Sequence, residues 1–192
     1  MAPRSPLARR PIAALAFAAA FVLAAAPLLA HEEGAAAGGV DLAATLGADF
    51  DRTSGRVVQL AEAIPADKFG WRPAEGVRSV SEVVMHVAAA NYALAASLGV
   101  APPAGADLEN LEKVTDRDQV LSTLKTSIDH AKQAFKAAEG TDFNRTVNAF
   151  GFEMPAARAV VILAAHSHEH LGQLIAYARS NGVTPPWSQP SS

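Results

Sequence analysis

Three histidines, His166, His168 and His170, fall within five consecutive residues and are the densest chemical signal in the sequence. In a helix, side chains four residues apart lie on the same face, so the imidazoles of His166 and His170 can aim at one point. His168 lies two residues from each of them and points to the other side. Two neutral imidazoles at this spacing form a bidentate clamp for a divalent metal ion. The spacing therefore predicts that His166 and His170 bind a metal.

A clamp with two ligands needs a third, and His86 is the best candidate elsewhere in the chain. Its predicted helix face also carries Val83 and Leu94, and a histidine on such a face is more often a core residue than a ligand. However, burying three imidazoles without a shared partner costs free energy, and one divalent ion satisfies all three nitrogens. Three protein nitrogens also leave a coordination position open, as in catalytic metal sites. We therefore expect a site at His86, His166 and His170.

Each polar side chain predicted near this site has two possible roles. Glu169 could orient a ligand or serve as a catalytic base, or it could be a solvated helix residue. Gln173 and Tyr177 continue the face of His166 and His170, where each could line a pocket or pack.

The remaining histidines are expected to be incidental. His130 and His168 are predicted to lie on solvated helix surfaces. His31 would become the N-terminal residue if the chain were cleaved after Ala30. An N-terminal histidine can chelate copper, but position alone suggests that role here.

Four apolar patterns with a period near 3.6 residues predict the helices that position these side chains. They span 41–64, 79–99, 115–138 and 155–181, and each begins or ends at a capping residue, proline or glycine. The stretch 141–152 is ambiguous and is either irregular or a short extended piece. The pattern predicts an all-α four-helix bundle.

Composition supports this fold and limits the chemistry. About half of the 192 residues are apolar, 18% are charged and 6% are aromatic, so the chain can build a core, and its alanine content favours helices. There is no cysteine, which excludes disulfides, thiolate metal sites and cysteine nucleophiles. Any bound metal must therefore be held by histidine, aspartate or glutamate.

The N-terminal region has the layout of a secretory signal peptide. Three arginines precede an apolar run over 12–26, and small residues lie near Ala30, so we predict cleavage after residues 1–30. The alternative is an uncleaved membrane anchor, for which the run is short. The protein is thus expected to be exported, to a periplasm or to the outside of the cell.

The mature chain is predicted to be acidic and to have a simple organisation. Removing the leader, which has three arginines and no acidic residue, changes the formal net charge from −3 to about −6. Such a domain is a poor partner for nucleic acid, and no membrane association is expected after cleavage. We predict a flexible spacer at 31–40, the bundle at 41–187 and a loose tail at 188–192.

Two segments of the sequence resemble motifs of the DinB-like (YfiT-like) superfamily. The first segment comprises Trp71-Arg72-Pro73, Arg78-Ser79-Val80, Glu82 and His86. The second comprises His166-x-x-x-His170, Gly172-Gln173-Leu174, Tyr177, Arg179, Gly182 and Pro185-Pro186. The resemblance implies a four-helix bundle with a histidine triad at His86, His166 and His170 that binds a divalent metal such as zinc or nickel. Leu171 departs from the family, which often has a basic residue there.

The resemblance also suggests two classes of function. Some members are thiol transferases, including mycothiol-dependent maleylpyruvate isomerases, and others are described only as metal-dependent hydrolases. We therefore expect a metal-dependent enzyme that acts on a small molecule by activating water or a thiol. The alternative is a non-catalytic exported bundle in which the metal has a structural, storage or stress-related role. A homodimer is also expected, whereas a pure partner-binding module is a third option.

Overall fold

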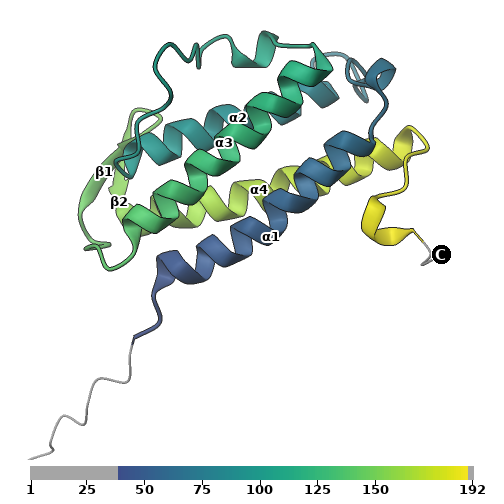
Figure 1. Ribbon diagram of the computed structural model, residues 1–192. Helices are drawn as coiled ribbons and strands as arrows, with labels where there is room; N and C mark the ends of the chain where they lie inside the picture. Colours follow the sequence, from purple (N-terminus) through teal and green to yellow (C-terminus); the bar gives the residue numbers. More distant parts are fainter. Residues whose placement is uncertain (1–38, 190–192) are drawn as a thin grey trace, which may run out of the picture. The chain divides into compact units, whose positions relative to one another are not determined.

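Four helices run alongside one another in the computed structural model (Figure 1). They are α1 (Leu42–Ala63), α2 (Val80–Ser97), α3 (Arg117–Ala138) and α4 (Ala156–Ser180). Each helix begins and ends within two residues of the span that the sequence predicts. The expected helical bundle is thereby confirmed, with a small two-stranded sheet added to it.

The structure describes residues 39–189. The predicted signal peptide, His31 and most of the predicted spacer lie outside the described residues. None of the helices between residues 39 and 189 combines the length and the apolar character needed to cross a membrane.

Side-chain caps explain where the helices begin. Ser79 Oγ accepts a hydrogen bond from the Glu82 amide at 3.3 Å, and the Glu82 carboxylate accepts one from the Ser79 amide at 2.6 Å. This is the reciprocal capping box that the sequence predicts for α2. Asp41 and Asp116 cap α1 and α3 in the simpler way, each accepting from an amide three residues on.

Each helix packs against two neighbours. α1 and α2 lie diagonally opposite, and each of them contacts both α3 and α4. Phe50 of α1 and Phe135 of α3 pack with ring centroids 5.2 Å apart, and Leu94, Leu124 and Leu163 are fully buried between the helices. Since α2 and α4 are neighbours, side chains from these two helices can meet inside the bundle.

A hairpin resolves the ambiguous stretch before α4. β1 (Thr146–Ala149) pairs antiparallel with β2 (Phe152–Pro155), and Phe150 and Gly151 form the two-residue loop between them. Both loop residues have positive φ, 55° and 81° respectively. Two positive φ values define a type I′ turn, whose twist suits paired strands. Phe150 is therefore in a conformation that glycine, asparagine or aspartate normally takes.

Three short 3₁₀ helices complete the described chain. η1 (Ala66–Lys68) follows α1, and η2 (Leu111–Lys113) packs against α2. η3 (Pro186–Ser188) contacts α1, and the guanidinium of Arg56 lies 5.4 Å from the Trp187 ring centroid. The loose tail predicted at 188–192 was thus placed too early, because Ser188 belongs to η3.

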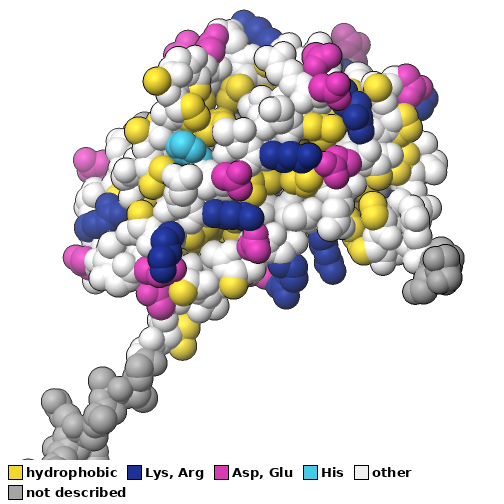
Figure 2. Space-filling model, viewed as in Figure 1, with side chains coloured by type: hydrophobic (Ala, Val, Ile, Leu, Met, Phe, Trp, Pro, Cys, Tyr) yellow, Lys and Arg dark blue, Asp and Glu magenta, His cyan; other side chains and the backbone are white. Residues whose placement is uncertain are grey.

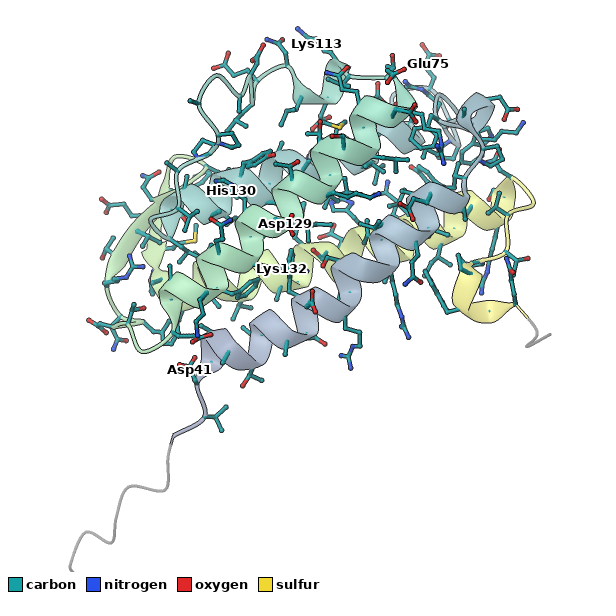
Figure 3. All side chains as sticks on the ribbon, in the orientation of Figure 1. Asp41, Glu75, Lys113, Asp129, His130 and Lys132 are labelled. Atoms are coloured by element: carbon teal, nitrogen blue, oxygen red, sulfur yellow. The ribbon has the colours of Figure 1, made fainter. Side chains whose placement is uncertain are left out.

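The face seen in Figure 2 carries basic and acidic side chains intermixed. Two ion pairs join α3 to α1, Lys132 with Asp51 at 2.5 Å and Lys125 with Glu62 at 2.6 Å. His130, which is labelled in Figure 3, is not simply solvated as predicted. Its Nε2 bonds to the carbonyl oxygen of Ala101, so this histidine fastens the loop after α2 to α3.

Candidate metal centre

Three imidazoles converge between α2 and α4. The Nε2 atoms of His166 and His86 are 3.3 Å apart, and those of His170 and His166 are 3.1 Å apart. One ring nitrogen from each residue lies within 4.8 Å of those from the other two. We call these three residues the histidine cluster. Among residues 39–189, no other group of three or more histidine, aspartate or glutamate donors comes together in this way.

A chain of hydrogen bonds fixes the tautomer of His170. The carbonyl oxygen of Arg78 can only accept, so the Tyr177 hydroxyl, 3.2 Å away, donates to it. The Tyr177 oxygen then accepts from the Gln173 amide nitrogen at 2.9 Å. This leaves Gln173 Oε1 facing His170 Nδ1 at 2.8 Å, so Nδ1 carries the proton. The Nε2 of His170 therefore presents a lone pair to the cluster.

A carboxylate fixes His86 in the same way. His86 Nδ1 lies 2.9 Å from Glu112 Oε1, and Arg78 donates two hydrogen bonds to the same carboxylate at 2.8 and 3.2 Å. Burial raises the pKa of Glu112, but the hydrogen bonds from Arg78 and His86 outweigh it and hold the pKa below its ordinary value. An ionised Glu112 only accepts, so His86 carries a proton on Nδ1, and in the neutral ring Nε2 presents a lone pair to the cluster.

His166 completes the cluster from a half-buried position on α4, one turn before the buried His170. Burial and the neighbouring positive charges lower its pKa to about 4. Burial is also the main cause that lowers the pKa of His170. His166 Nδ1 is buried without a hydrogen-bond partner among the described residues. Because His166 and His170 are neutral at pH 7, no positive charge on their rings keeps a cation out.

The donor set fits a divalent metal ion. When the Nε2 atoms of His86 and His170 carry lone pairs, only His166 can contribute a proton to the three facing nitrogens. One proton cannot satisfy all three of them. One divalent cation accepts all three lone pairs at once. Nitrogens bound at 2.0–2.1 Å to a tetrahedral zinc lie about 3.3 Å apart, close to the two short separations in the cluster.

The structure does not bring Glu169 into this arrangement. Glu169 is exposed, and no hydrogen bond in the described part of the chain joins it to an imidazole. It acts on His170 only as a nearby negative charge that raises the pKa of that imidazole. His168 faces the other side of α4, as predicted, where its Nε2 contacts Asp49 and Thr53 of α1.

The carboxylate beside the cluster is that of Glu112, which the sequence analysis missed. Glu112 lies 26 residues from His86 in sequence, on the 3₁₀ helix η2, where no helical periodicity ties it to the histidines. Gln173 and Tyr177, by contrast, lie on the predicted face, and the structure gives them the role of orienting His170.

Two pockets lie at the site, one lined by histidines of the cluster and one by the residues that orient their rings. One is apolar, has a volume of about 460 Å³ and is lined in part by His86 and His166. The other is polar, has a volume of about 620 Å³ and includes Arg78, Glu112 and Gln173, which hold the Nδ1 side of the cluster. The apolar pocket therefore gives a small molecule access to two of the three histidines.

Comparisons with known proteins agree with this architecture. A family model described as the DinB superfamily matches residues 49–174. A solved DinB-like protein from Bacillus cereus has a TM-score of 0.62 at 15% identity, over 73% of this chain and 93% of that chain. Another from Bacillus subtilis has a TM-score of 0.53 at 23% identity, over 77% and 96% respectively. None of the curated proteins matches. At these identities the structural likeness concerns the fold.

Proposed function

The chain belongs to the DinB superfamily, and we propose that it is a metal-dependent enzyme with one divalent ion held by the histidine cluster. The observation that carries the proposal is the convergence of three Nε2 atoms, two of which are fixed as lone-pair donors by partners at Nδ1. Zinc or nickel suits three imidazole nitrogens.

The chain's own residues orient the ligands. Glu112 and Gln173 hold the rings of His86 and His170 and keep the protons on Nδ1. Arg78 links the hydrogen bonds that hold His86 to those that hold His170. Its guanidinium binds Glu112, and its carbonyl accepts from Tyr177. A divalent ion bound here would lower the pKa of a water or thiol that it coordinates, which supplies a nucleophile near neutral pH. Hydrolysis and transfer of a thiol are the two reaction classes that follow.

Access to the cluster favours catalysis. In the described residues, the group of possible ligands consists of these three histidines. A tetrahedral ion bound by them would keep one coordination position for a small molecule. The apolar pocket reaches two of the histidines. We further propose, from the leader-like residues 1–30, that the enzyme acts after export, and that it forms a homodimer.

A structural role for the ion is the second candidate. His86 belongs to α2, whereas His166 and His170 belong to α4, so an ion held by all three would tie two neighbouring helices together. This role needs no substrate, and stability alone would depend on the metal.

Metal content tests the proposal. We expect about one equivalent of zinc or nickel in the mature protein purified without a histidine tag. The metal should be lost in His86→Ala and retained in His168→Ala, because His168 lies outside the cluster and faces α1. A wild-type protein that takes up no metal after incubation with both ions would contradict the proposal.

A further inference from the structure

The apolar pocket beside the histidine cluster has the size of a small-molecule site. Its volume of about 460 Å³ lies within the range of ligand pockets in proteins. It is bounded by α2, α4, the loop before η2 and the tip of the hairpin. The residues that matter here are His86, Ala89, Ala93, Leu108, Phe150 and Ile162.

The space exists because α2 presents alanines to it. Ala89, Ala90 and Ala93 line the pocket, whereas the same helix buries larger residues such as Leu94 in the core. The one charged residue in the lining is Glu109. Apolar walls strongly disfavour a charged group that has no partner. The chemistry of the walls therefore selects an uncharged and mainly apolar occupant.

Phe150 lies at the edge of this pocket in a strained conformation. Its φ of 55° is in the left-handed region, which bulky side chains rarely adopt. Its side chain is 55% exposed, and it also lines a neighbouring pocket with Phe152. Neither core packing nor turn formation requires a phenylalanine here, since glycine would fit the turn better. Backbone strain of this kind is concentrated at active sites and at segments that clamp a ligand.

We infer that the apolar pocket binds the uncharged aromatic or branched aliphatic part of the substrate, and that Phe150 covers it. His86 and His166 of the histidine cluster lie in the wall of the pocket, so the polar, reacting end of the same molecule can approach the cluster. This inference rests on the proposed function for the identity of the ligand as a substrate. The binding itself depends only on the pocket.

Fluorescence titration with N-phenyl-1-naphthylamine, a neutral apolar probe, tests the inference on the full mature chain. We expect saturable binding to the wild type and binding at least about tenfold weaker in Ala93→Phe, whose ring fills the pocket. Ala96→Phe is the matched control, because Ala96 is exposed on the same helix outside the pocket and should leave binding unchanged. If Ala93→Phe does not fold, as judged by circular dichroism, Ala89→Leu replaces it.

Phe150→Gly separates ligand contact from turn formation. Glycine relieves the backbone strain, so the variant should melt at the same temperature as the wild type or higher, while probe binding falls by about threefold or more. A phenylalanine kept only for structure would leave probe binding unchanged, which contradicts its role as a cover.

Metal content measured on the same samples separates the two proposals. Ala93→Phe should retain the wild-type amount of metal. Absence of metal from the wild type would remove the proposed function, yet the probe would still decide whether the pocket binds apolar molecules. No saturable binding to the wild type, or equal binding to wild type and Ala93→Phe, would overturn the inference.

Discussion

At the scale of single residues, the candidate site is defined by which nitrogen of each imidazole carries its proton. Glu112 and Gln173 accept from the Nδ1 atoms of His86 and His170, so in the neutral rings the lone pair of each is on Nε2, the atom that faces the cluster. Hydrogen bonds of this type orient metal-binding histidines and raise their basicity. The partners are therefore expected to matter for metal affinity although none is itself in the ligand group.

Glu112→Ala tests this expectation. Removing the carboxylate frees His86 Nδ1, and we expect the affinity for zinc to fall about 10- to 100-fold. Competition with a metal-binding indicator dye measures the change. Glu169→Ala is the matched control, because Glu169 is exposed and makes no hydrogen bond to the cluster in the described chain. Equal losses in the two variants would show that only general negative charge matters.

At the scale of elements, two glycines of α1 differ in what surrounds them. A Cβ added at Gly47 would lie 3.1 Å from Cβ of Phe135, an atom fixed directly to the backbone of α3. A Cβ added at Gly55 would meet nothing within 4 Å. The close approach of α1 to α3 thus depends on one of these glycines and not on the other.

Gly55→Ala is expected to stabilise the protein by about 0.5–1 kcal/mol, because alanine loses less backbone entropy in a helix. Gly47→Ala should gain nothing or destabilise the protein, since the new methyl group crowds Phe135. Urea unfolding at matched m-values measures both changes. The same increase in stability for both variants would show that α1 and α3 are not packed as described.

The capping box of α2 has a definite pH dependence. The pKa of Glu82 lies below its ordinary value of 4.5, chiefly because its carboxylate accepts from the Ser79 amide, with burial opposing and Arg72 assisting. A depressed folded-state pKa stabilises the fold fully above pH 4.5 and loses that contribution as pH falls through the folded value.

Glu82→Gln removes the charge at the start of α2 while keeping the side-chain shape. We expect a loss of about 0.3–1 kcal/mol at pH 7 that shrinks as the pH falls below 4.5. Chemical unfolding at a series of pH values measures it. Glu75→Gln, in the exposed loop before α2 (Figure 3), is the control and should change little. A difference that persists unchanged at low pH would exclude the charge as its cause.

At the scale of the whole molecule, the histidine cluster joins neighbouring helices that are distant in sequence. α2 and α4 approach each other only through the packing of the bundle, and the loop that carries η2 then places Glu112 over His86. The hairpin between α3 and α4 brings Phe150 to the same region. Metal binding and folding should therefore be coupled.

Removing the metal is expected to lower the melting temperature by about 5–10 °C when the free ion exceeds its dissociation constant about a hundredfold. Thermal melts of the wild type with and without EDTA measure the shift. His86→Ala should melt at one temperature under both conditions. An EDTA effect of the same size in that variant would place the stabilising ion elsewhere.

Local sequence patterns were sufficient to predict the four helices and the members of the histidine cluster. Helical periodicity and caps are local, so the bounds of α1–α4 could be predicted within two residues. The four-residue spacing placed His166 and His170 on one face and His168 on the other, and the structure shows that arrangement. The single histidine on the apolar face of α2 then left few choices for the third member.

The residues that surround the histidine cluster could not be predicted, because tertiary packing places them. Glu169 is next to His170 in sequence, but the helix turns its side chain to solvent, whereas Glu112 reaches His86 from a 3₁₀ helix 26 residues away. The position of such a segment depends on how the bundle packs, which no local pattern encodes. The pocket and the strained Phe150 likewise result from distant elements meeting, because an empty volume belongs to no single stretch of chain.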